Sequence, residues 1–270
     1  MPLIAAVQLT STSDMARNLD TAEALIRRAA GYGATLVATP EATDYLGPHS
    51  QKVRIAEPLG GPTHQRLGAL AAELGITLLI GSVAEQFDET RTYNTSLLFG
   101  PSGDLLAHYR KLHLFDVDLA AAGGVTFRES DRTAPGESVV VCDTPAAKVG
   151  MSICYDVRFA ELYRTMADRG AEIMSVPAAF TMMTGKDHWH VLLRARAIEN
   201  QCWVVAPAQV GRHNSTRESH GETVVIDPWG RVVARKNKGR GLVLADIDLR
   251  AVDRVRRGLP CLAHTRRSLI

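Results

Sequence analysis

Hydrophobic residues in this chain form short apolar runs that alternate with stretches of helical periodicity. Residues 3–9 and 35–38 are apolar runs that predict buried strands. Asp14, between them, can cap a helix. The apolar positions after Asp14 recur at the spacing of one helix face: Leu19, Ala22, Ile26 and Ala29. Strands and helices therefore alternate from the beginning of the sequence.

The same alternation continues along the chain and then returns. A predicted helix over residues 63–74 ends at Gly75. Predicted strands follow at residues 76–83, 93–99 and 105–109. The second series begins at Val139, with predicted strands ending at Cys142 and Ile153 and a helix ending at Ala167. A strand at 172–176 and a helix at 187–201 follow. The last predicted strands lie at 203–208, on both sides of 227–230, and at 242–247. This order predicts one α/β domain over residues 1–270, with a two-sheet core and a pseudo-symmetric plan.

Composition and charge disfavour several classes of protein. The 270 residues are 46% hydrophobic, which is enough for a sizeable core and too apolar for a disordered chain. Lys and Arg number 31 against 29 Asp and Glu, so the net charge is only +2. Basic residues are not interleaved with aromatic ones, and we expect no nucleic-acid partner. The Arg-rich stretch at residues 250–257 is interpreted as a solvated helix face.

The sequence favours a cytoplasmic location. The first residues lack a charged leader and soon become polar, which argues against a signal peptide. No apolar stretch approaches the roughly 18 residues that a membrane span needs. The four cysteines form no Cys-x-x-Cys pair, as expected in a reducing compartment. Three of them, Cys142, Cys202 and Cys261, are interpreted as small buried hydrophobic residues.

Cys154 differs because it stands where an apolar strand gives way to the start of a helix. The positive end of a helix favours thiolate over thiol, so Cys154 is a candidate nucleophile. A nucleophile also needs a base and a group that holds the oxyanion. Glu41 follows the second strand and Lys111 follows the strand at residues 105–109, so both are expected at strand ends. Each could instead be an ordinary surface charge.

Three segments resemble the signature segments of the nitrilase superfamily of carbon–nitrogen hydrolases. They are Pro-Glu-Ala-Thr-Asp-Tyr around Glu41, Tyr-Arg-Lys-Leu-His-Leu-Phe-Asp around Lys111, and Ile-Cys-Tyr-Asp-Val-Arg-Phe around Cys154. Motifs at residues 184–185, 188–189, 193–199, 208–213 and 227–230 resemble the deaminated glutathione amidase branch, which is related to omega-amidases. The similarity covers essentially the whole chain. It implies a four-layer α-β-β-α sandwich with two central sheets.

The resemblance also implies catalytic roles. It implies that Cys154 is the nucleophile and Glu41 the general base, while Lys111 and the backbone N–H of Tyr155 hold the oxyanion. Glu129 is implied as a second glutamate that orients the lysine and the substrate. A thiol of ordinary pKa, about 8.5, is largely protonated at neutral pH, so a carboxylate that accepts its proton makes it a competent nucleophile. The resemblance implies no metal and no other cofactor.

Three further residues are implied to bind the substrate. The branch uses the arginine at the position of Arg158 for the substrate carboxylate, and a guanidinium can bind a carboxylate bidentately. Phe180 and Thr184 match positions that line the same pocket. Structural alternatives stay open, since Arg158 could pair with Asp156 or Glu161, Phe180 could pack in the core, and Thr184 could cap a helix.

Two other histidine-based sites fit the pattern less well. His188 and His190 suggest a metal pair, but a spacing of two places them on different faces of a helix and no third ligand is apparent. His113 could partner Cys154 as in a papain-like hydrolase, although the glutamate and lysine explain the chemistry without it.

Three places depart from the branch pattern: residues 219–222 (Ser-His-Gly-Glu), Asp187, and residues 119–124. The first two are expected to border the substrate mouth. The departures leave the catalytic set intact and affect the expected leaving group and substrate.

The resulting prediction is an amidase for a small-molecule amide, deaminated glutathione, which it cleaves to 2-oxoglutarate and cysteinylglycine. The first alternative is an omega-amidase that releases ammonia from 2-oxoglutaramate or a related dicarboxylate monoamide. A non-catalytic binding protein that kept the fold is the alternative of another class, and the intact catalytic residues argue against it. Nitrile or carbamoyl substrates suit Arg158 less well than a carboxylate does. The resemblance further implies a homodimer or higher homo-oligomer that uses residues 249–270.

Overall fold

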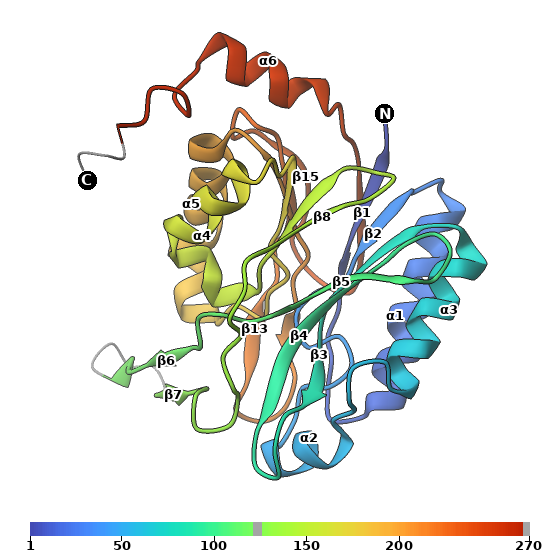
Figure 1. The fold of residues 1–270 in the computed structure, drawn as a ribbon. Coiled ribbons are helices and arrows are strands. Elements are labelled where there is room, and N and C mark those ends of the chain that lie inside the picture. The colour runs from blue at the N-terminus through green and yellow to red at the C-terminus, as the bar shows by residue number, and fades with distance from the viewer. Residues whose placement is uncertain (121–125, 267–270) are drawn as a thin grey trace.

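Two six-stranded sheets face each other between outer layers of helices (Figure 1). The computed structural model describes residues 1–120 and 126–266. In spatial order the first sheet contains β16 (Gly241–Asp246), β1 (Leu3–Gln8), β2 (Leu36–Ala38), β3 (Thr77–Gln86), β4 (Thr92–Phe99) and β5 (Leu105–Arg110). The second contains β15 (Val232–Lys236), β14 (Thr223–Ile226), β11 (Trp203–Ala206), β10 (Ile173–Ser175), β9 (Lys148–Met151) and β8 (Val140–Asp143).

The two sheets share one plan of strand pairing. In the first, β1, β2 and β3 are parallel, and β16, β4 and β5 add antiparallel strands at the two sides. In the second, β9, β10 and β11 are parallel, and β8, β14 and β15 take the corresponding antiparallel places. The pseudo-symmetric plan predicted from the order of elements is therefore confirmed.

Helices cover the outer face of each sheet and complete the predicted four-layer sandwich (Figure 1). Helices α1 (Met15–Gly31) and α3 (Pro62–Leu74) lie on the first sheet, and α4 (Ala160–Asp168) and α5 (Met182–Asn200) lie on the second. Asp14 caps α1 as predicted, because its side chain accepts the backbone N–H of Arg17 at 3.1 Å. Gly75, with φ +64°, ends α3 in the left-handed conformation that glycine favours.

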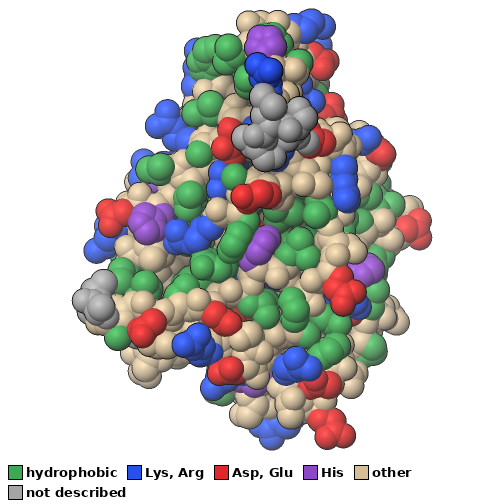
Figure 2. Space-filling view, turned by 60° about the vertical axis from the view of Figure 1, so that its left-hand side comes forward, with side chains coloured by type: hydrophobic (Ala, Val, Ile, Leu, Met, Phe, Trp, Pro, Cys, Tyr) green, Lys and Arg blue, Asp and Glu red, His purple; other side chains and the backbone are tan. Residues whose placement is uncertain are grey.

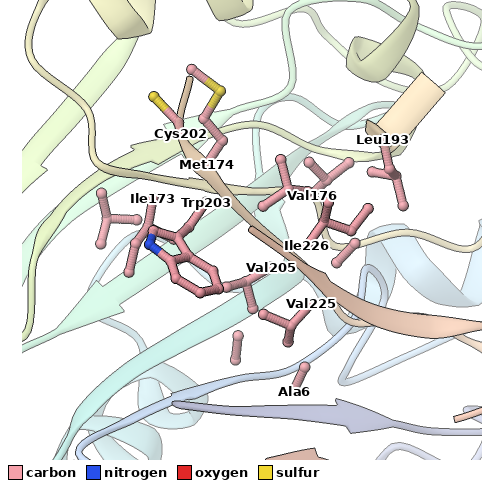
Figure 3. Close-up of a cluster of buried hydrophobic side chains, with 14 of the residues drawn as sticks. Ala6, Ile173, Met174, Val176, Leu193, Cys202, Trp203, Val205, Val225 and Ile226 are labelled. Carbon is pink, nitrogen blue, oxygen red and sulfur yellow. The ribbon is translucent and has the colours of Figure 1, made fainter. Parts of the chain in front are cut away.

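Alternation along β1 shows how the layers are joined. Ile4 and Ala6 face the second sheet, whereas Ala5 and Val7 belong to the separate cluster that includes residues of α1 and α3. Figure 3 shows Ala6 lying near Val205 and Val225 of the second sheet, all in one buried cluster. Because both faces of these strands are covered, they appear in the sequence as continuous apolar runs.

Several sequence predictions require correction. Helix α5 begins at Met182 and not at residue 187, because the Thr181 side chain caps it. Cys202 is buried as expected, but Cys142 is only half-buried and Cys261 is exposed, since it follows α6 (Arg250–Gly258) outside the core. Short elements were missed: α2 (His49–Ile55), β6 (Asp116–Val117), β7 (Phe127–Arg128), β12 (Val210–Arg212) and β13 (Glu218–His220).

Within the described residues, none of the helices is both long and apolar enough to cross a membrane. On the side of the molecule turned forward in Figure 2, hydrophobic side chains are interspersed with charged ones.

Candidate active site

Three strand ends bring the predicted catalytic residues together. Glu41 follows β2, Lys111 directly follows β5, and Cys154 follows β9 at the first residue of a short 3₁₀ helix, η2 (Cys154–Arg158). Strand β5 runs in the same direction as β2, because two antiparallel pairings separate it from the parallel strand β3. The Glu41 and Lys111 ends therefore lie at the same edge of the first sheet.

A buried ionic cluster forms at this edge. The Lys111 Nζ atom lies 2.8 Å from Glu129 Oε2 and 3.2 Å from Glu41 Oε1. Asn94 donates from Nδ2 to Glu41 Oε1 at 2.9 Å and to Glu129 Oε1 at 3.4 Å. Lys111 is 2% exposed and Glu41 is 6% exposed, so these charges are stabilised by one another rather than by solvation. Asn94 could not be recognised from the sequence, because its role depends on which face of β4 is turned inward.

Electrostatics fix the resting protonation state of the cluster. Burial opposes ionisation of Glu41, but the Lys111 ammonium and the Cys154 thiol outweigh it and lower the pKa of Glu41. Burial also opposes the charge on Lys111, but Glu129 and Glu41 together raise the pKa of Lys111. Burial and the Glu41 carboxylate raise the pKa of Cys154. The resting site therefore holds a carboxylate, an ammonium and a neutral thiol, and the thiolate expected from the helix end is not favoured.

The backbone at Cys154 is held in an uncommon conformation. Its φ is +50°, in the left-handed region that residues with a Cβ rarely adopt, and such positions often occur at active sites. The Cys154 N–H donates to Pro177 O at 2.9 Å. Among the described residues, the Tyr155 N–H donates no backbone hydrogen bond. The turn therefore presents a free donor beside the thiol.

Asp156 fixes the Cys154 turn from inside the protein. Its carboxylate is fully buried and accepts the backbone N–H of Ile153 at 2.9 Å and the Tyr109 hydroxyl at 2.7 Å. It also accepts the backbone N–H of His113 at 3.0 Å and lies 2.7 Å from His113 Nδ1. Asp156 therefore joins the nucleophile turn to the segment that carries Lys111. The sequence pattern gave Asp156 only a possible pairing with Arg158, which it does not make.

The Glu41 turn is held by groups from both halves of the chain. Gln209 donates from Nε2 to the Glu41 carbonyl oxygen at 2.9 Å, and the Ala179 N–H donates to Glu41 Oε2 at 2.8 Å. Ser82 accepts the Ala42 N–H at 2.8 Å. A Cβ on Gly81 would lie 2.2 Å from Thr39 O, so β3 passes too close to this turn for any larger residue.

A cavity of about 230 Å³ opens over the cluster. Part of its lining comes from residues between Glu41 and Lys52 and from residues 82–84, and another part comes from Tyr155, Phe180, Thr181 and Thr184. Glu41, Lys111, Glu129 and Cys154 all line this cavity. The geometry therefore brings together every catalytic residue predicted from the sequence, with three of the four predicted substrate-binding residues beside them.

Comparison with known proteins identifies the family to which this site belongs. The carbon–nitrogen hydrolase family profile matches residues 3–257. Human deaminated glutathione amidase is 45% identical over 100% of this chain and 84% of its own length. The chain belongs to the carbon–nitrogen hydrolase family. Human omega-amidase NIT2 is 38% identical to this hydrolase over 98% of its chain and 95% of the relative.

Solved structures agree with this assignment of the hydrolase. The C. elegans NitFhit protein has a TM-score of 0.93 at 39% identity, covering 100% of this chain, which spans 66% of that longer protein. An amidase from Nesterenkonia sp. AN1 has a TM-score of 0.80 at 27% identity, covering 95% of this chain and 94% of its own. That structure is of a mutant of the amidase, in which the acetamide moiety of fluoroacetamide is covalently added at the active-site cysteine.

Arg158 is the predicted substrate-binding residue that does not line the cavity of this hydrolase. Its guanidinium carbon lies 5.4 Å from the centre of the Phe180 ring and 5.7 Å from that of Tyr155, behind two aromatic residues of the wall. Both terminal nitrogens lie 3.3 Å from His188 Nδ1. Neither of the ion pairs considered for Arg158 from the sequence, with Asp156 or with Glu161, is formed within the described residues.

The other sequence alternatives are placed by their contacts. Phe180 both packs on Trp189 and lines the cavity, and Thr184 follows the Thr181 cap inside the first turn of α5. His113 is bound to Asp156 and stacks on Phe159, with ring centres 3.6 Å apart, so it does not partner the thiol. His190 contacts Glu222, and the described part of the chain contains no cluster of three or more metal-ligating side chains.

The described positions that depart from the branch pattern lie next to the cavity lining or beyond it. Asp187, His220 and Glu222 do not line the cavity themselves, and the His220 N–H donates to the carbonyl oxygen of Phe180, a lining residue, at 2.9 Å. His220 instead packs against Gly185, where a Cβ would lie 2.4 Å from its ring, and Glu222 accepts from Arg235. Of residues 119–124, positions 121–124 lie outside the described residues.

Proposed function

We propose that this hydrolase is a cysteine amidase whose substrate is deaminated glutathione, cleaved to 2-oxoglutarate and cysteinylglycine. The observation that carries the proposal is the buried cluster of Glu41, Lys111, Glu129 and Cys154 at one cavity. The curated relatives named deaminated glutathione amidase, at 42–45% identity, supply the substrate. We treat residues 1–270 as one carbon–nitrogen hydrolase domain.

Acylation begins with the neutral thiol of Cys154. Glu41 accepts the thiol proton as sulfur attacks the amide carbon, and the carbonyl oxygen becomes negative. The Lys111 ammonium and the free N–H of Tyr155 hold this oxyanion. When the carbon–nitrogen bond breaks, Glu41 returns the proton to the leaving nitrogen. The acyl group remains on Sγ as a thioester, and the amine departs as cysteinylglycine.

Deacylation uses the same groups with water as the nucleophile. Glu41 takes a proton from water as its oxygen attacks the thioester carbon, and the same oxyanion site holds the charge. The carbon–sulfur bond then breaks, the proton returns to sulfur, and 2-oxoglutarate is released. Glu129 keeps Lys111 in place through both steps, because it accepts both the Lys111 ammonium and the Phe115 N–H.

Arg158 is proposed to bind the carboxylate of the acyl group near the wall of Tyr155 and Phe180. The guanidinium contacts His188 and has no acidic partner among the described residues. A substrate carboxylate would supply that partner through charge-assisted hydrogen bonds. An omega-amidase that acts on 2-oxoglutaramate would use the same acyl contacts, and human omega-amidase NIT2 supports it as the second candidate.

Assembly and location complete the proposal. We expect a cytoplasmic homodimer. Exposed apolar side chains on and beside α5 support an interface between two copies, with Val191 at 66% and Ile198 at 47% exposure. A concentration-independent monomer in multi-angle light scattering would contradict the dimer.

The proposed reaction is tested by product analysis with a panel of amides. The purified protein is incubated with deaminated glutathione, 2-oxoglutaramate and pentanamide, and dipeptide, ammonia and acid are quantified. Dipeptide release with a higher kcat/KM than ammonia release supports the first function, whereas efficient release of ammonia alone supports the omega-amidase. No turnover of any of the three would support the non-catalytic alternative.

A further inference from the structure

The wall that continues from the Glu41 turn contains a second lysine that the mechanism does not use. Lys52 lies on α2, the short helix that follows this turn, and lines the same cavity as Cys154 and Glu41. Lys52 could not be recognised from the sequence, because α2 has no fully buried residue and no clear apolar period.

Lys52 has no direct partner. Among the described residues its ammonium makes neither a hydrogen bond nor an ion pair within 4 Å, although it is half-buried. Burial lowers the pKa of Lys52, and the carboxylates of Asp44, Glu129 and Glu41 act in the opposite direction. The ammonium therefore lies near the catalytic acids and has free donors. A partly desolvated cation of this kind is stabilised when a ligand supplies an anion.

The remaining cations of the cavity differ from Lys52. Lys111 already pairs with two acids, Glu41 and Glu129, and in the proposed mechanism it also holds the oxyanion. Arg128, Arg132 and Arg217 also line the cavity, but they are exposed, and hydrated charges gain little from pairing. Lys52 is therefore the cavity cation with most to gain from a bound carboxylate.

The position of Lys52 indicates which end of a substrate it meets. Glu41 delivers the proton to the leaving nitrogen in the proposed mechanism, and Lys52 lies on the wall that continues from Glu41. Tyr155 and Phe180, whose rings contact the Arg158 guanidinium, line the cavity from the second half of the chain. A substrate that spans the cavity would place its acyl acid toward Arg158 and its leaving group toward Lys52.

We propose that Lys52 is a specificity-determining residue that binds a carboxylate on the leaving amine. Such a contact favours an anionic dipeptide as leaving group over ammonia. This inference rests on the proposed amidase function and extends it, because it explains how a substrate with acids at both ends would be selected.

Three substrates test the inference with the full-length protein. They are deaminated glutathione, the same compound with its C-terminal carboxylate converted to a carboxamide, and 2-oxoglutaramate. Lys52→Met keeps the length of the side chain and removes the charge. We expect it to lower kcat/KM for deaminated glutathione about 10- to 100-fold, mainly through KM, and at least tenfold more than for the other two substrates.

Controls separate a local effect from loss of folding. Lys186→Met changes an exposed lysine that does not line the cavity and should leave all three substrates unaffected. Lys52→Arg should retain much of the preference for the charged leaving group. In a Cys154→Ala background, calorimetry should show weaker binding of deaminated glutathione after Lys52→Met, without reference to turnover.

The outcomes distinguish this inference from the proposed function. Equal losses for all three substrates, or no loss, would overturn the role of Lys52 while leaving the amidase intact. If the unaltered protein cleaves 2-oxoglutaramate but not deaminated glutathione, both the dipeptide substrate and this role of Lys52 are rejected. If it cleaves no amide, the proposed function itself fails.

Discussion

The two catalytic turns lie in corresponding sheets but are held in different ways. Each has a residue with a Cβ at positive φ, Ala42 after Glu41 and Cys154 itself. The Glu41 turn of the first half is tied to Gln209 and Ala179 of the second. The Cys154 turn is tied through Asp156 to the strand and loop that carry Lys111.

Neither half therefore contains an active site by itself. The base and the lysine come from the first half and the nucleophile from the second, and each turn depends on polar groups from the opposite half. The shared strand plan gives the two sheets similar edges. Hydrogen bonds between the two halves then hold the catalytic residues of both edges close together. Breaking one set of bonds at a time therefore measures what each half contributes.

Removal of the nucleophile should give the largest effect. We expect Cys154→Ala to lower kcat by about 10³-fold or more, because the thioester can no longer form. Stability should change by less than about 1 kcal/mol, since only one small polar group is lost. Single-turnover assays and chemical denaturation measure the two quantities.

Cys202→Ala is the matched control from the core of the second half. Its thiol is fully buried and contacts Ala171 O at 3.0 Å, so the change should lower stability by about 1–2 kcal/mol and leave kcat nearly unchanged. Parallel losses of activity and stability in both variants would mean that Cys154 acts through packing.

Asp156→Asn should loosen the nucleophile turn. Asparagine keeps the size of the side chain but cannot accept all four hydrogen bonds, so we expect a loss of about 1–3 kcal/mol in stability. The same change should lower kcat about 10- to 100-fold by misplacing the thiol. Denaturation and pre-steady-state acylation measure both.

Gln209→Ala removes the hydrogen bond that holds the Glu41 turn and leaves the Cys154 turn unchanged. We expect Gln209→Ala to lower the rate of the pH-dependent proton transfer to Glu41. Asp156→Asn should instead lower the acylation rate at all pH values. Normal acylation by folded Asp156→Asn protein would show that Asp156 is only a structural residue.

Arg158→Lys tests the wall that belongs to the second half. The substitution keeps the charge but loses the planar fork, so KM for amides with an acidic acyl group should rise about tenfold. Pentanamide, which lacks the acid, should change much less. The effects of the substitution and of the neutral substrate should be non-additive, because both remove one contact. An equal rise in KM for both substrates would mean that Arg158 only supports the side chains of Phe180 and Tyr155.

The sequence predicted those parts of the molecule that follow from local pattern. The apolar runs identified the central strands, and the strand ends located Glu41, Lys111 and Cys154. Asn94, Asp156 and Gln209 could not be found in this way, because their roles arise only when two sheets and several turns pack together. Lys52 was missed for a related reason, since its short helix carries no periodic signal. The raised pKa of Cys154 likewise depends on burial beside Glu41, which the helix position alone does not reveal.

The last effect, on stability rather than on turnover, is expected at Asp44, a buried carboxyl group in the first-half wall of the cavity. Burial raises the pKa of Asp44 to about 6, although the Ala84 N–H and Lys52 oppose the rise. In the unfolded chain the ordinary value near 3.8 applies. Folding therefore favours the protonated form of Asp44. The contribution of protonated Asp44 to the free energy of unfolding is complete below pH about 4 and is lost as the pH rises through about 6.

Asp44→Asn removes this titration while keeping an acceptor for the Ala84 N–H. Relative to the unaltered protein, the variant should gain about 1–3 kcal/mol in stability between pH 4 and pH 7, roughly the free energy of a two-unit shift. Urea denaturation at several pH values measures the difference, with exposed Asp131→Asn as a control that should show none. A difference that does not vary with pH would mean that Asp44 remains ionised through its interaction with Lys52. The first-half wall would then hold a permanent ion pair, and Lys52 would be less available to a substrate carboxylate.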